Sequence, residues 1–263
     1  MPDTIWSATD LTDPTTWDRF AELVRASSDA DVRRALATED LSPRDLAALL
    51  SPAAEKHLDE MARMAREITL RRFGKVVVLY VPFYLSNECV NHCTYCYFAK
   101  DVDLARSTLT PPQVDAEVDR LKAARFDHVL LLTGEDRRAA PPEYVRDTVA
   151  VCHDRFSSVG VEIYPMSSEE YAALVGAGCD AITLYQETYH QPTYAAAHPR
   201  GPKRDFAARP AAPSRAAAAG TRSAGLGALP GPAARRVAGV GLAAPRHASP
   251  RDHRRARPPP PLP

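Results

Sequence analysis

The chain has 263 residues, of which 45% are hydrophobic and 25% are charged, and its formal net charge is zero. These values are typical of globular proteins, and a neutral chain lacks the basic excess of a general nucleic-acid binder. No stretch reaches the roughly 18 apolar residues of a membrane span, and the acidic N-terminus carries no secretory pattern. The neutrality hides an asymmetry, because residues 1–200 hold 21 Lys and Arg against 31 Asp and Glu, whereas residues 201–263 hold 12 against 2.

Residues 1–74 are expected to form a helical N-terminal extension. Ser42–Pro43 and Ser51–Pro52 are N-cap and first-turn signals. After the second signal, apolar side chains recur every three or four residues, which predicts one face of a long amphipathic helix. Those positions are Leu58, Met61, Met64, Ala65 and Ile68.

Residues 75–206 alternate between strand and helix patterns. The run 75–86 (KVVVLYVPFYLS) is rich in β-branched and aromatic residues, which indicates a strand buried on both faces. Strands alternating with helices predict a parallel α/β sheet, and repeated units of this kind close into a TIM-type (β/α) barrel. In such barrels the chemistry lies at the carboxyl ends of the strands. Further strands are expected at 128–133, 158–165 and 180–185, and helices after Thr110–Pro111 and at 142–156 and 167–176.

Residues 207–263 have a different composition, dominated by Ala, Pro, Arg and Gly and without Phe, Trp or Tyr. Such a segment buries too little apolar surface to offset its ordering entropy, so a disordered tail is expected over most of it. A helix and a strand remain recognisable within 213–229, with the strand, the fifth of the sheet, at 222–229. With at most five strands, the barrel is expected to be incomplete.

Three of the five cysteines, Cys89, Cys93 and Cys96, lie within eight residues directly after the first predicted strand. This clustering indicates metal ligation in a reducing compartment, so we expect a cytoplasmic protein. Three thiolates on a four-iron cluster leave one iron open, whereas four would serve electron transfer only. The open iron can be chelated by S-adenosylmethionine (AdoMet). A zinc site with His92 as fourth ligand is the alternative, but structural zinc usually takes its ligands from two separated pairs.

The cysteine spacing is typical of the radical SAM superfamily, and two nearby features agree with that resemblance. Tyr95 precedes the third cysteine, where the superfamily often has an aromatic residue that approaches the adenine. Gly134 and Glu135 follow the second strand, where a Gly-Gly-Glu-like turn commonly binds the methionine amino group. The resemblance therefore implies that Tyr95, Gly134 and Glu135 contact AdoMet.

The chain resembles the 2-iminoacetate synthases, the radical SAM tyrosine lyases of thiamine thiazole biosynthesis, over roughly residues 50–206. Its similar stretches are LYVPFYLSNECVNHCTYCYF (79–98), HVLLLTGED (128–136), VEIYPMSSEEYAALVGAGCDAITLYQETY (161–189) and HPRGPKRDF (198–206).

This resemblance implies a [4Fe–4S] cluster on Cys89, Cys93 and Cys96, AdoMet as second cofactor and L-tyrosine as substrate. The products would be 2-iminoacetate and p-cresol, with thiazole synthase as partner and flavodoxin or ferredoxin as reductant. Glu162, Gln186 and Glu187, at the ends of the third and fourth strands, would face AdoMet or the substrate. The other reading is that these polar residues only solvate the barrel mouth.

The sequence departs from the family at two places. Tyr97 stands where relatives more often have a small residue, usually glycine, and its bulky side chain must either point away from the cluster or crowd AdoMet. The family also continues with further strands beyond the point where this chain turns rich in proline, so we expect a frameshifted or truncated copy with little activity. The hydrogenase-maturation tyrosine lyase is the nearest alternative, although no cysteine follows Cys179 to hold its second cluster. Tryptophan-cleaving and deazaflavin-forming relatives, and a non-catalytic cluster-binding remnant, are further alternatives.

Overall fold

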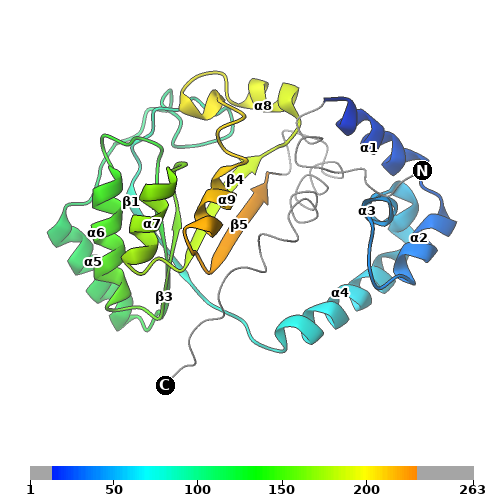
Figure 1. The fold of residues 1–263 in the computed structure, drawn as a ribbon, viewed down its shortest axis with the longest axis horizontal. Helices are drawn as coiled ribbons and strands as arrows, with labels where there is room; N and C mark the ends of the chain where they lie inside the picture. Colours follow the sequence, from blue (N-terminus) through cyan, green and yellow to red (C-terminus); the bar gives the residue numbers. More distant parts are fainter. Residues whose placement is uncertain (1–13, 230–263) are drawn as a thin grey trace. The chain divides into compact units, whose positions relative to one another are not determined.

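The computed structural model describes residues 14–229, which divide into two compact units (Figure 1). One unit holds the described residues up to Val77 together with Glu187–Tyr194, and is called here the helical unit. The other holds Val78–Gln186 and Ala195–Gly227, and is called the sheet unit. No helix of the described residues is long and apolar enough to cross a membrane.

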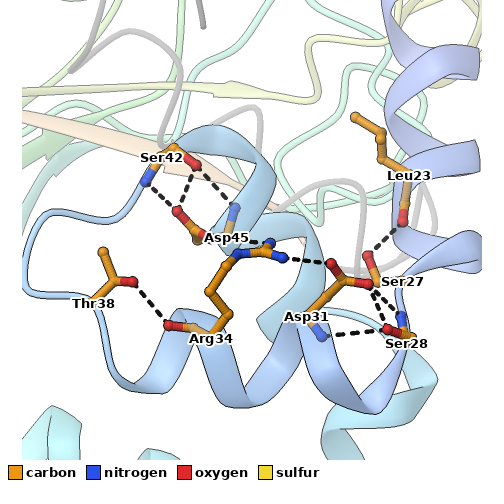
Figure 2. A network of polar contacts seen from close by, with 8 residues as sticks. All are labelled: Leu23, Ser27, Ser28, Asp31, Arg34, Thr38, Ser42 and Asp45. Atoms are coloured by element: carbon orange, nitrogen blue, oxygen red, sulfur yellow. Dashed lines mark hydrogen bonds and ion pairs between the residues drawn. The ribbon is translucent and has the colours of Figure 1, made fainter.

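The helical unit is built from short capped helices, as the Ser-Pro signals predict. Ser28 and Ser42 cap α2 and α3, and each side-chain oxygen accepts a bond from the backbone N–H three residues on. The carboxylates of Asp31 and Asp45 in turn accept hydrogen bonds from the backbone N–H groups of Ser28 and Ser42. These reciprocal bonds complete two capping boxes. Arg34 donates to both aspartates, at 2.7 Å and 3.4 Å, and so links the two helix starts (Figure 2). The elements are α1 (Pro14–Ala26), α2 (Asp29–Leu36), α3 (Pro43–Leu49), the 3₁₀ helix η2 (Pro52–His57) and α4 (Leu58–Phe73).

The helix predicted from Ser51 differs in its start and in its packing. Ser51 precedes the 3₁₀ helix η2, and the α-helix α4 begins only at Leu58. No side chain of α4 is buried among the described residues, although Met61 packs against a small apolar cluster. The amphipathic pattern therefore predicts the helix correctly but not the burial of its apolar face.

The sheet unit contains a five-stranded sheet in the order β1-β2-β3-β4-β5, with parallel pairing shown from β1 to β4. This sequential order is the winding of a (β/α) barrel, and it confirms the predicted α/β class. Valines and leucines of the strands pack against helices α5, α6, α7 and α9 to form the main core. The strands are β1 (Val81–Ser86), β2 (His128–Thr133), β3 (Ser158–Glu162), β4 (Ala181–Glu187) and β5 (Ser223–Ala228). The helices are α5 (Pro111–Ala123), α6 (Pro142–His153), α7 (Ser168–Gly176), α8 (Gln191–Ala197) and α9 (Ala212–Ala218), with the 3₁₀ helix η3 (Pro202–Arg204) between the last two.

The first strand is shorter than predicted and is not buried on both faces. β1 begins at Val81, and residues 76–80 form no secondary structure, with side chains 58% to 79% exposed. Within β1, Phe83 and Leu85 are buried whereas Pro82 and Tyr84 are exposed. The reason is that β-branched residues favour extended backbone only where a neighbouring strand and a covering layer are present. β1 pairs with β2 on one side alone among the described strands.

The boundary drawn after residue 206 is too early, because α9 and β5 lie beyond it. Ala212 and Ala216 are fully buried in the main core, so small side chains supply the packing that aromatic residues provide elsewhere. The helix and strand expected within 213–229 match these two elements. The expectations for residues 230–263 lie outside the described residues.

Candidate functional site

The three cysteines lie on one loop that leaves the carboxyl end of β1, as the spacing and strand context predict. Cys89 and Cys93 are buried and Cys96 is partly exposed. Tyr97 is 69% exposed, so its bulky ring turns to solvent and away from the buried thiols. The loop therefore presents three thiols with the one unusual side chain directed outward.

Residues 197–203 pack along this loop and hold its backbone. The amide of His92 donates to the Arg200 carbonyl at 3.2 Å, and that of Thr94 donates to the Ala197 carbonyl at 3.0 Å. Gly201 adopts φ +94°, and a Cβ there would lie 2.5 Å from Asn91 Oδ1, so only glycine fits this approach. The stretch HPRGPKRDF thus contributes structure to the cysteine loop from more than 100 residues away in the chain.

Gly134, at the end of β2, is required by a close approach of the same loop. A Cβ on Gly134 would lie 2.1 Å from the Glu88 carbonyl oxygen and 3.1 Å from Cys89 Cβ. The Gly134 amide donates to the Ser86 carbonyl at 2.9 Å. Because Gly134 has no side chain, the turn after β2 can pack directly against Cys89.

Glu135 is held by two hydrogen bonds within the sheet unit. Its carboxylate accepts from Arg209 at 2.5 Å and from the Asn91 side-chain amide at 2.8 Å. Burial alone would raise the pKa of Glu135, but the charges of Arg209 and Lys203 and the bonds from Arg209 and Asn91 outweigh it and lower that pKa. Glu135 is therefore a charged carboxylate held in a fixed place beside the cysteine loop. Arg209 and Asn91 were not expected from the sequence.

Tyr95 lies in a polar contact rather than in an open position. A hydrogen bond of 2.7 Å joins its hydroxyl to Nε2 of His198, which is completely buried. The ammonium of Lys203 lies 5.8 Å from the centroid of the Tyr95 ring, within the range of a cation–π contact. Two residues of the HPRGPKRDF stretch therefore orient the aromatic side chain next to Cys96.

A pocket of about 700 Å³ opens beside these residues and is large enough for a cofactor or a small substrate. Glu135, Lys203 and Arg209 line it together with Val90 of the cysteine loop. Arg137 lines it as well, stacked 4.9 Å from the Tyr164 ring centroid. The pocket thus offers both a carboxylate and several cations, which suits a ligand that carries charges of both signs.

Two polar atoms at the carboxyl ends of the strands are buried without a hydrogen-bond partner among the described residues. They are Oγ1 of Thr133 on β2 and Oε1 of Gln186 on β4. The amide nitrogen of Gln186 donates to the Phe206 carbonyl at 3.4 Å, which leaves its oxygen for another donor. A buried polar atom without a partner is costly, and a bound ligand is one way to satisfy it.

The other strand-end residues have definite positions. Glu162 ends β3 and is partly exposed, paired in register with Leu132 and Thr183. Glu187 ends β4, is buried and has the left-handed φ of +69°, a backbone conformation that is uncommon for a residue other than glycine.

The surroundings of the thiols bear on which metal they could hold. Burial raises the pKa of Cys93 to about 11; Lys203 opposes the rise, while Cys96, Glu135 and Cys89 add to it. Within residues 14–229 no three His, Cys, Asp or Glu side chains converge so as to hold a single ion. His92, the fourth ligand that zinc would need, uses one of its two ring nitrogens, Nδ1, for a hydrogen bond of 2.6 Å with Asp101. A four-iron cluster is a larger body that three separated thiolates can hold.

Comparison with known proteins places the chain among enzymes of one superfamily. The model of the Radical SAM superfamily matches residues 83–232. The 2-iminoacetate synthase of Salmonella typhimurium is 42% identical over 215 residues, which are 82% of this chain and 57% of the relative. The 2-iminoacetate synthase of Escherichia coli is 41% identical with the same coverage.

Among solved structures, HydG, a maturase of the [FeFe]-hydrogenase, superposes with a TM-score of 0.84 at 30% identity. That match covers 90% of this chain and 55% of HydG. The similarity indicated by the motifs is thereby confirmed. The chain spans little more than half the length of the proteins that it matches.

Proposed function

Because the chain belongs to the radical SAM superfamily, we propose that it binds a [4Fe–4S] cluster and AdoMet and cleaves the Cα–Cβ bond of L-tyrosine. The observation that carries this proposal is the placement of three thiols of one loop beside a pocket that holds the charged carboxylate Glu135. The identity to 2-iminoacetate synthases supports the choice of reaction.

Cys89, Cys93 and Cys96 would hold the cluster as thiolates, so that ligation releases their protons. With AdoMet bound, the cluster would supply the radical chemistry that removes hydrogen from the substrate. The chain's own task is to bind, orient and enclose the reactants.

Glu135 of the pocket, Tyr95 of the cysteine loop and residues at the strand ends would divide this task between them. Glu135, charged and fixed by Asn91 and Arg209, would accept the methionine ammonium through the lone pairs that its two bonds leave. Tyr95, held by His198, would lie against the adenine. Gln186 and Glu162 lie at the ends of β4 and β3. The oxygen of Gln186, buried without a partner among the described residues, would accept from a hydroxyl or ammonium of AdoMet or the substrate.

Besides tyrosine and AdoMet, the overall reaction needs two electrons and one proton. L-Tyrosine divides into 2-iminoacetate and p-cresol, whose atoms add up to those of tyrosine. Two electrons would enter from a reductant such as flavodoxin or ferredoxin. One is used in the cleavage of AdoMet to methionine and 5′-deoxyadenosine, and the other, with a proton, replaces the hydrogen that 5′-deoxyadenosine carries away from tyrosine. The imine is short-lived in water, so thiazole synthase is the partner that we propose to consume it for thiamine biosynthesis.

A product assay tests this proposal. The protein is reconstituted anaerobically with iron and sulfide and then incubated with AdoMet, dithionite and L-tyrosine. In keeping with the low activity expected from the sequence, we expect 5′-deoxyadenosine and a small but detectable amount of p-cresol from the unaltered chain, and neither product from a Cys93→Ser variant. A loaded cluster that releases 5′-deoxyadenosine without p-cresol would refute tyrosine as substrate. A loaded cluster that releases neither would identify the chain as a non-catalytic cluster-binding protein.

A further inference from the structure

One side chain closes the cysteine loop from its far end. The guanidinium of Arg106 donates four hydrogen bonds to backbone carbonyls that flank the three cysteines. Nη1 donates to Asn87 at 2.7 Å and to Phe98 at 2.9 Å. Nη2 donates to Ala99 at 2.7 Å and to Val102 at 3.3 Å. Asn87 precedes the first cysteine and the other three carbonyls follow the last, so Arg106 joins the two ends of the loop.

Asn87 also joins the two ends of the loop, through hydrogen bonds to Ala105 and Ser107. Its side-chain amide donates to the Ala105 carbonyl at 2.8 Å, and its side-chain oxygen accepts from the Ser107 amide at 2.7 Å. The backbone amide of Asn87 also donates to the Ser107 carbonyl at 3.2 Å. The loop from Asn87 to Ser107 is therefore closed by the protein's own bonds, independently of any bound group.

The role of Arg106 follows from its hydrogen bonds to four backbone carbonyls. Four carbonyl oxygens that converge on one point repel one another unless a cation lies between them. Within residues 14–229 no carboxylate forms an ion pair with Arg106, so its charge is directed to these carbonyls alone. The planar guanidinium spans two pairs of acceptors in a fixed geometry, which a lysine ammonium cannot reproduce.

We propose that Arg106 is a positioning residue that shapes the cysteine loop for the cluster before iron arrives. This inference rests on the proposed function, because it assumes that the loop receives a cluster. Without Arg106, the carbonyls of residues 98, 99 and 102 would lose these hydrogen bonds and would accept from water instead. The turn that follows Cys96, in which the Ala99 amide donates to the Cys96 carbonyl at 3.0 Å, would loosen, and the third thiol would lose its place.

The test compares Arg106→Ala and Arg106→Lys with the unaltered chain. Arg120→Ala is the matched control, because Arg120 is exposed and, within residues 14–229, its one ion pair is with Glu117 on its own helix. Amide exchange across residues 87–107 is measured first in the iron-free protein. Iron per chain and the EPR spectrum of the reduced cluster are then measured after reconstitution.

In Arg106→Ala we expect exchange in the loop to accelerate by about tenfold or more, since hydrogen bonds to a charged donor are lost. Iron uptake should fall, and the EPR spectrum should broaden or change type. Arg106→Lys keeps the charge and part of the bonding, and should restore the EPR spectrum with intermediate exchange. Arg120→Ala should match the unaltered chain in all three measurements.

Unchanged loop exchange in both variants, or unchanged iron content and EPR spectrum in Arg106→Ala, would overturn the proposal. If Arg106→Ala fails to fold, Arg106→Lys decides, since loop exchange equal to that of the unaltered chain would refute the need for the planar fork. If the unaltered chain takes up no iron, the proposed function fails, whereas loop exchange in the iron-free variants still tests Arg106.

Discussion

Replacing Glu135 by Gln should destabilise the sheet unit strongly, because it leaves the Arg209 guanidinium without its carboxylate. The side chains of Arg209 and Glu135 are only 5% and 16% exposed. Removing one partner of a buried ion pair costs about 3–5 kcal/mol. Since Glu135 keeps some contact with solvent and Arg209 also donates to the Tyr185 carbonyl at 3.2 Å, we expect the lower end, about 3 kcal/mol.

Amide exchange of β2 and β3 in the iron-free protein measures this cost within the sheet unit itself. A loss of about 3 kcal/mol corresponds to exchange that is roughly a hundredfold faster. Arg209→Gln should cost a similar amount, and the double variant should cost clearly less than the sum of the two. Asp119→Asn is the control, because Asp119 pairs with Arg155 on the surface and should cost about 1 kcal/mol at most. Additive costs within about 0.5 kcal/mol would show that the two charges are not coupled.

Three further predictions concern other parts of the chain. Gly134→Ala should displace the cysteine loop and abolish most iron uptake, whereas Gly176→Ala, where a Cβ meets nothing within 4 Å, should leave it unchanged; iron analysis after reconstitution distinguishes the two. Burial alone would raise the pKa of Asp45, but its bonds from Ser42 and Arg34 outweigh it and lower that pKa, so the stability it contributes is complete above about pH 4 and is lost on further acidification. Thermal unfolding from pH 6 to 3 should therefore depend less on pH in Asp45→Asn, and an identical dependence would contradict this. Gln186→Met should change the free energy of unfolding by less than about 1 kcal/mol, because it removes an oxygen that is buried without a partner among the described residues. The affinity for AdoMet or tyrosine, measured by equilibrium dialysis, should nevertheless fall about fivefold or more.

The cysteine loop and the order of strands could be predicted from the sequence because their signals are local. The spacing of Cys89, Cys93 and Cys96 spans eight residues, and each strand and helix has its own periodicity. The bonds that shape the site join distant residues instead. Arg209 lies 74 residues from Glu135, and Lys203 lies 112 residues from Asn91, to which its backbone amide donates at 2.8 Å.

The amino-acid composition of residues 207–229 led to a wrong expectation of disorder, because the buried side chains there are small. Ala212 and Ala216 of α9 are fully buried, although their segment has the alanine and arginine content expected of a disordered tail. Hydrophobic runs misled the interpretation in the opposite sense at residues 76–80, whose apolar side chains are exposed. In both places burial depends on which element lies alongside, and no local pattern encodes that.

The central claim is that the three thiols hold a [4Fe–4S] cluster with one iron open to AdoMet, and EPR of the reconstituted, reduced protein tests it most directly. The unaltered chain should give the signal of a reduced [4Fe–4S] cluster, and adding AdoMet should shift that signal because the ligands of the open iron change. The signal should be absent when any one of Cys89, Cys93 and Cys96 is replaced by Ala. Stoichiometric zinc without iron uptake, or a cluster signal that AdoMet leaves unchanged, would contradict the claim.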